Sequence, residues 1–174
     1  LAPSIQIDDR GQIQVPDSIL EASVEPLSDA SRGLQNNNPM NLAATETNDW
    51  EGELSPDTSN LTEAMPDNGF ERFRNPVMGV RAGVQDLLDT QLDDGIRTVR
   101  GIIKSHSLTQ EEPYIEFVAE RLGVSPSDRI DLTNPNTLMD TVKAMIEFEN
   151  GPQPYTDETL AIGAALAFEA KGQT

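Results

Sequence analysis

Residues 137–155 read TLMDTVKAMIEFENGPQPY, and this segment decides both the fold and the candidate site. At about 100° per residue its apolar side chains fall on one side of a helix, which we predict over residues 136–149. Glu149 lies about 20° from Leu138 on this helix, within the apolar face, whereas Glu147 lies on the solvent side. The segment therefore predicts a carboxylate on the buried face of a helix, in its last turn.

That placement is unfavourable for a charged side chain. Burial removes water from the Glu149 carboxylate, and the dipole at a helix C-terminus opposes negative charge. Both effects favour the protonated form, which is the form that a general acid working near neutral pH needs. A structural carboxylate fits the same pattern, either paired with a basic residue or released into water where the last turn frays. The pattern leaves both interpretations open.

Four further helices are predicted on the two sides of this segment, from the spacing of apolar residues and from capping signals. They span residues 76–92, 98–106, 110–122 and 157–170. Asn75 and Pro76 mark the clearest boundary, because Asn is a good N-cap and Pro suits the first helical turn. The predicted fold class is therefore mainly α, with one helical domain over residues 31–174.

The first thirty residues have a different character and are predicted to form a separate N-terminal arm, residues 1–30. Within it, residues 4–15 alternate apolar and polar side chains around the turn-forming sequence DDRG, which predicts a small β-hairpin. A short helix within residues 18–24 is expected to follow. The apolar residues that would pair across the hairpin are Ile5, Ile7, Ile13 and Val15.

Residues 31–72 are rich in turn-forming sequences, and we predict an ordered loop layer there. The apolar residues expected to hold this layer down are Trp50, Leu54, Leu61, Met65, Phe70 and Phe73. The segment RGLQNNNPMNL (32–42) offers many amide donors and acceptors, which suit either sugar hydroxyls and N-acetyl groups or the capping of loop backbone. Trp50 is the single tryptophan, and it fits either a sugar-stacking platform or an apolar anchor.

Acidic residues outnumber basic ones by 30 to 12, which gives a net charge of −18. Nucleic acids and anionic membrane surfaces are therefore poor partners. No cysteine is present, which excludes disulfides and thiolate chemistry. The single histidine, His106, cannot form a His-rich metal site, so we interpret it as a partly exposed helix-end residue and expect neither metal nor cofactor. No segment reaches the roughly 20 apolar residues that span a bilayer.

Several motifs resemble, in the same order, a domain found in bacteriophage virion proteins, and the resemblance covers about residues 32–165. The matching motifs are RGLQNNNPMNL (32–42), the Trp-x-Gly of 50–52, FERFRNPVMGVRAGVQDL (70–87), IRTVRGIIKSHS (96–107), EEPYIEFVAERLGV (111–124) and AMIEFENGPQPY (144–155). Two positions depart from the usual pattern, because His106 stands where an aromatic residue is expected and Phe148 where histidine is common.

Proteins with this domain are structural or internal virion proteins that are often lysozyme- or lytic-transglycosylase-like. The resemblance implies a lysozyme-like helical domain in the phage virion, which acts on host peptidoglycan in the periplasm and cell wall during genome delivery. Its partners would be glycan strands and other virion proteins. Glu149 would protonate the glycosidic oxygen. The side chains that would hold the sugar are Gln35, Asn37, Asn41, Trp50 and Tyr155.

The bond-breaking chemistry depends on whether a second carboxylate is present. A lysozyme needs one on the other face of the bond, at roughly 5–9 Å from the first, and the candidates are Asp49, Glu51 and Glu71. A lytic transglycosylase works with one Glu that acts as acid and then as base, which fits this sequence better.

The order of two motifs suggests a circular permutation of a lysozyme-type site. Transglycosylases of the lysozyme superfamily usually carry the Glu motif first and a Gly-Leu-Met-Gln-x-x-Pro motif later, whereas here ENGPQP (149–154) follows RGLQNNNP (32–39). The hypothesis predicts that Glu149 and the 33–39 loop are neighbours in space.

Two other functional classes fit the same residues. The chain fits a non-catalytic virion component that keeps a lysozyme-like fold, with the arm and the acidic loops as assembly surfaces. It also fits, less well, a secreted bacterial module that binds wall sugars without cleaving them.

Overall fold

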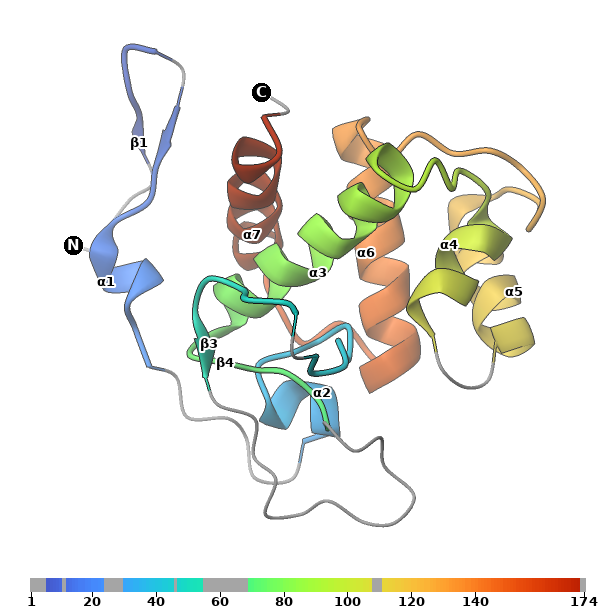
Figure 1. Cartoon of the computed structure of the whole chain (residues 1–174), viewed down its shortest axis with the longest axis horizontal. Coiled ribbons are helices and arrows are strands. Elements are labelled where there is room, and N and C mark those ends of the chain that lie inside the picture. Colours follow the sequence, from blue (N-terminus) through green and yellow to red (C-terminus); the bar gives the residue numbers. More distant parts are fainter. Residues whose placement is uncertain are drawn as a thin grey trace.

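The computed structural model describes residues 6–10, 12–23, 30–45, 47–54, 69–107 and 111–172. Within these residues the chain is mainly helical and carries two small antiparallel sheets, as Figure 1 shows, so the predicted mainly α fold with a small hairpin is confirmed. The helices are α1 Asp17–Leu20, α2 Arg32–Gln35, α3 Pro76–Leu92, α4 Val99–His106, α5 Glu111–Leu122, α6 Pro135–Asn150 and α7 Asp157–Ala170. The strands are β1 Gln6–Ile7, β2 Ile13–Gln14, β3 Glu53–Leu54 and β4 Arg72–Phe73.

Helix α3 is the centre of the fold, with α7 packed on one side and the α4–α6 group on the other (Figure 1). It begins as predicted, because the Asn75 side chain accepts a hydrogen bond from the Met78 N–H at 3.0 Å. Its buried face joins a single core with the later helices. The largest fully buried members of that core include Tyr114, Leu87, Leu88, Ile102, Ile103, Leu138 and Met145.

The loop layer contains short elements that the sequence did not reveal, namely α2 and the β3–β4 pair. Each is only two to four residues long, too short for a periodic pattern to identify. A second apolar cluster, in which Leu42, Phe73, Met78 and Ala82 are buried and Trp50 is half-buried, holds this layer on α3. The expectation for Leu54 was wrong, because its side chain is 42% exposed and anchors nothing. The positions of Leu61 and Met65 lie outside the described residues.

The N-terminal arm forms the predicted hairpin, with Ile7 opposite Ile13 in an antiparallel register. Ile5 lies outside the described residues. Helix α1 begins at Asp17 and is shorter than the predicted segment. The arm is fixed to the start of α3, because the Asn75 amide donates to three backbone carbonyls of the α1 region at 2.9–3.1 Å. The hairpin itself projects away from the helices (Figure 1).

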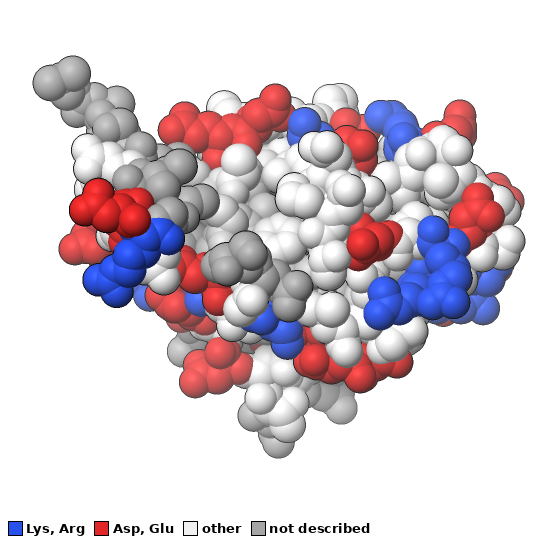
Figure 2. All heavy atoms as spheres, turned by 90° about the horizontal axis from the view of Figure 1, so that it is seen from above, with Lys and Arg blue, Asp and Glu red and all other residues white. Residues whose placement is uncertain are grey.

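Acidic side chains are spread over the face seen in Figure 2, whereas the largest basic group gathers at the end where α4 and α5 lie. Such a surface repels other polyanions at long range. In the part of the chain that the structure describes, no helix combines the length and the apolar character needed to cross a lipid bilayer.

Candidate functional site

Glu149 occupies the last turn of α6, as predicted, and is half-buried. Its Oε2 accepts a hydrogen bond of 2.8 Å from the Asn41 Nδ2. Asn41 belongs to the Asn-rich segment, residues 31–42, which lies more than a hundred positions earlier in the chain. Asn41 lies two positions beyond the 33–39 loop, and the loop itself contacts Asn150, the residue after Glu149, through Gly33 and Pro39. The predicted proximity of this loop to Glu149 is therefore confirmed. Glu147 is less exposed than expected, with 22% of its side chain accessible, because it pairs with Arg121 of α5 at 2.5 Å.

Asn150 ties the end of α6 to the Asn-rich segment. Its Nδ2 donates to the Pro39 carbonyl at 2.7 Å, and its Oδ1 accepts from the Ser31 hydroxyl at 2.5 Å. Gly33 permits this approach, because a Cβ at that position would lie 2.7 Å from the Asn150 Oδ1 and 2.8 Å from the Asn38 carbonyl oxygen. The Arg32-Gly33 motif therefore packs directly against the Glu149-Asn150 motif.

The three consecutive asparagines mostly serve the backbone. The fully buried Asn38 accepts from the Leu42 N–H at 2.9 Å and donates to the carbonyls of Leu42 and Glu71 at 2.9 and 3.0 Å. Asn37 donates to the Phe73 carbonyl at 3.1 Å and adopts a positive φ of 50°, a conformation that asparagine tolerates better than most residues. The backbone-capping interpretation therefore describes these two residues, whereas Asn41, at φ 52°, turns its amide to Glu149.

Tyr114 of α5 lies beside Glu149 on the side of the helical core. Its ring stacks on Phe148 with centroids 4.1 Å apart and planes 11° apart. Burial first, and then the Glu149 carboxylate, raise the pKa of Tyr114. The Tyr114 hydroxyl and the Asn41 Oδ1 are both buried and have no hydrogen-bond partner of ordinary geometry among the described residues. Buried polar atoms are usually paired, so the Asn41 Oδ1 is a candidate to bind a hydroxyl or amide of a ligand, whereas the Tyr114 hydroxyl faces the Glu149 carboxylate.

His106 differs from its predicted environment. Only 4% of its side chain is exposed, because the end of α4 packs against α3 and the Asn-rich segment. The Nε2 lies 2.6 Å from the Met40 carbonyl oxygen, and the Nδ1 lies 3.2 Å from the Asp86 Oδ2. Burial alone would lower the pKa of His106. The opposing effects are larger and raise that pKa overall; they come from the hydrogen bond and charge of Asp86, the Met40 carbonyl and the Glu149 charge. The apolar spacing of α4 gave no signal for these polar partners.

No model of a known protein family matches the sequence. Over 147 residues the chain is 34% identical to Protein P5 of Pseudoalteromonas phage PM2, an alignment that covers 82% of this chain and 85% of that protein. The chain belongs to the Protein P5 family. This membership confirms the bacteriophage character that the motifs indicated.

Two other predicted sugar ligands of this P5-family chain are half-buried aromatic residues. Trp50 packs in the second apolar cluster with its indole nitrogen buried and unpartnered among the described residues, which favours the anchor interpretation. Tyr155 packs against the main core, where burial raises the pKa of its hydroxyl. Gln35 lies at the end of α2, and its Nε2 donates to the Ala30 carbonyl at 2.6 Å.

The three candidate second carboxylates of this P5-family chain have different environments. Asp49 is exposed, and Glu51 is paired with Arg81 at 2.6 Å. Glu71 is fully buried, and neither carboxylate oxygen has a hydrogen-bond partner of ordinary geometry in the described residues. Desolvation first, and then the charge of Glu53, raise the pKa of Glu71 to about 7.

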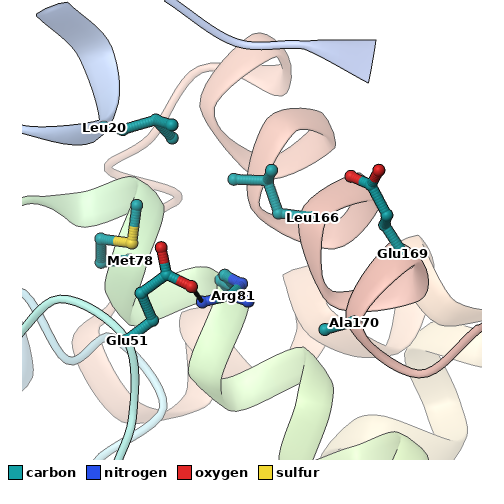
Figure 3. Close-up of a pocket in the computed structure, with 7 residues that line it drawn as sticks. All are labelled: Leu20, Glu51, Met78, Arg81, Leu166, Glu169 and Ala170. Carbon is teal, nitrogen blue, oxygen red and sulfur yellow. Dashed lines mark hydrogen bonds and ion pairs between the residues drawn. The ribbon is translucent and has the colours of Figure 1, made fainter. Parts of the chain in front are cut away.

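A cavity of about 250 Å³ lies away from this cluster, between α1, α3 and α7 (Figure 3). Arg81 and Glu51 meet on one wall, and Leu20 and Leu166 line the apolar part. The cavity shares no residue with the Glu149, Asn41 and Tyr114 group, so the candidate acid and this cavity belong to different parts of the molecule.

Proposed function

We propose that this P5-family chain is a component of the phage virion that cleaves the glycan strands of host peptidoglycan, with Glu149 as the acid–base residue. The observation that supports this most is the hydrogen bond from Asn41 to Glu149 at 2.8 Å. Together with the contact of Asn150 with Pro39 at 2.7 Å, it supports the idea that the two motifs resembling the lysozyme superfamily form one site, in the swapped chain order that a circular permutation requires. The lysozyme-like domain would be residues 31–174, with residues 1–30 as an arm for assembly.

The proposed reaction is that of a lytic transglycosylase. Glu149 gives its proton to the glycosidic oxygen between N-acetylmuramic acid and N-acetylglucosamine, and the bond from that oxygen to the muramic C1 breaks. The resulting Glu149 carboxylate then takes the proton of the muramic C6 hydroxyl. At the same time the C6 oxygen bonds to the muramic C1, which closes the anhydro ring. One carboxyl group returns to its starting state, so no second carboxylate is required.

The neighbouring polar groups would orient Glu149 and the sugar. Asn41 donates to the Oε2 of Glu149, and the Tyr114 hydroxyl interacts with the same carboxyl group, so the two side chains orient the acid. We propose direct sugar contacts for Asn41 and Tyr155, whose Oδ1 and hydroxyl oxygen lack partners among the described residues. Gln35, Asn37 and Trp50 would act mainly by fixing the shape of the loop around the sugar.

The test is digestion of purified peptidoglycan by the parent protein and by the Glu149→Gln variant, with the products identified by mass spectrometry. Anhydromuramic products from the parent, and none from the variant, are expected. Glu147→Gln is the matched control, because it changes the same residue type two positions earlier on α6 and lies in an ion pair with Arg121. It should keep the parent's activity. Reducing-end products would instead mean a hydrolase with a second carboxylate.

A non-catalytic structural role is the second candidate function. It is favoured by the use of Asn37, Asn38 and Asn150 as backbone ligands, since these contacts stabilise the fold whether or not a sugar binds. The projecting hairpin of the arm fits an assembly role as well (Figure 1). Absence of any product from a correctly folded parent would overturn the enzymatic proposal in favour of this one.

A further inference from the structure

The imidazole of His106 faces a hydrogen-bond acceptor at each of its two nitrogens. One is the Met40 carbonyl oxygen, 2.6 Å from the Nε2, and the other is the Asp86 carboxylate, 3.2 Å from the Nδ1. A neutral imidazole has a single N–H and can satisfy only one of them, whereas an imidazolium donates to both. The geometry therefore favours the charged form of His106, held inside the protein with 4% of its side chain exposed.

The groups around the ring support that charge. Asp86 approaches from α3 and is 33% exposed, and the Glu149 charge acts from α6. The Asn-rich segment contributes only the Met40 carbonyl, and the basic neighbour on α4 itself, Lys104, has 49% of its side chain in solvent. Two carboxylates and a carbonyl dipole thus surround one buried cation in the described part of the molecule.

The Met40 carbonyl is half of the peptide group that leads into Asn41. A hydrogen bond to this oxygen fixes the plane of the peptide and therefore the starting direction of Asn41, whose backbone has the uncommon φ of 52°. The Met40 side chain is fully buried against Gly83 of α3, where a Cβ would lie 2.4 Å from its sulfur. The segment is thus held at both the side chain and the carbonyl of Met40, and the Asn41 amide then meets Glu149.

We propose that His106 is a positioning residue, whose imidazolium bridges Asp86 to the Met40–Asn41 peptide and thereby aims the Asn41 amide at Glu149. The inference rests on the proposed function, in which Glu149 is the acid–base residue, and it identifies what holds that residue's hydrogen-bond partner. Deprotonation leaves a ring that can serve only one of its two acceptors, so the bridge opens when His106 loses its proton.

The first experiment is an NMR titration of the full chain. His106 is the single histidine, so its ring signals need no assignment by mutation. The ring should be doubly protonated with a midpoint above its ordinary 6.5, and the side-chain amide signals of Asn41 should shift with the same midpoint. In His106→Gln the Asn41 amide signals should move at every pH. In Asp86→Asn a neutral ring can donate to Met40 and accept from the new amide, so its midpoint should fall below 6.5 and the Asn41 signals should lose their pH dependence.

The second experiment measures peptidoglycan cleavage. His106→Gln should lower kcat by about 10- to 100-fold with little change in KM, because it misplaces a group at the acid without removing a sugar contact. Lys104→Gln removes a positive charge from the same helix and should change kcat less than about twofold. A wild-type ring that titrates at or below 6.5, or Asn41 signals that are the same in His106→Gln, would overturn the bridge. A wild-type protein without cleavage would refute the proposed function, while the NMR result still decides the bridge.

Discussion

Helices α3–α7 and the Asn-rich segment, residues 31–42, are stabilised by different interactions. The helices bury aliphatic and aromatic side chains in one core, and ion pairs between them such as Arg100 with Glu112 at 2.5 Å lie on exposed side chains. In the segment the buried amides of Asn37 and Asn38 lie among the apolar residues Pro39, Met40 and Leu42, and Asn38, with none of its surface exposed, bonds only to backbone groups. The difference teaches that apolar volume fixes the helical part, whereas hydrogen-bond geometry fixes the part that reaches Glu149.

The largest expected effect tests the helical side of this comparison. Leu138 of α6 is fully buried in the main core, so Leu138→Ala should lower the free energy of unfolding by about 2–5 kcal/mol. Leu138→Met keeps most of the volume and should cost less than about 1.5 kcal/mol. Urea denaturation followed by circular dichroism measures both. Equal losses in the two variants would contradict the view that apolar volume is what this helix contributes.

The same division explains how much of the fold the sequence predicts. Helices α3 and α7 were predicted at their observed ends, because apolar spacing and caps such as Asn75 are local signals. Helix α2 was missed, because its four residues are held by contacts with α6, such as Asn150 over Gly33, that no local pattern encodes. The apolar spacing of a four-residue segment gives no information on such partners.

The candidate site shows the same limit. Periodicity placed Glu149 in the last turn of the correct helix, and the motif order predicted that the Asn-rich loop lies next to it. His106 was placed at its helix end but given the wrong environment, because its partners Met40 and Asp86 lie 66 and 20 positions away. The spacing of apolar residues along a helix does not indicate a buried charge whose partners are distant in sequence.

The second prediction tests the segment with an apolar replacement. Asn38→Leu keeps the branched shape of the parent side chain but removes one acceptor and two donor contacts, so buried groups of Leu42 and Glu71 lose their partners. We expect a loss of about 2–3 kcal/mol in the free energy of unfolding, measured by urea denaturation. The Asn41 side-chain amide signals should also move, because Asn38 sets the turn that presents Asn41. A loss of unfolding free energy smaller than that of Leu138→Met would mean that packing, and not hydrogen bonding, shapes the segment.

The third and smallest effect concerns Glu71, the residue whose carbonyl Asn38 holds. Its pKa is raised from 4.5 to about 7 by burial and by Glu53, so the folded state binds a proton that the unfolded state releases. The stability that this proton contributes is complete below pH 4.5 and is lost as the pH rises through 7. Glu71→Gln imitates the protonated form, so it should be more stable than the parent at pH 8 by about 1–3 kcal/mol and should match it near pH 4.5.

Unfolding free energies of the parent and of Glu71→Gln between pH 4.5 and 8 measure this difference. Subtracting one curve from the other removes the titration of the remaining carboxylates. Glu51→Gln is the control, because that side chain is 62% exposed in its pair with Arg81 and should change stability by less than about 1 kcal/mol at any pH. Glu53→Gln should narrow the gap between the parent and Glu71→Gln, since it removes the charge that disfavours the Glu71 carboxylate. Parallel curves for the parent and Glu71→Gln would show that the pKa of this carboxyl group is the same in the folded and unfolded states. The group would then be ionised at neutral pH, and the loop layer would tolerate a buried charge as well as buried amides.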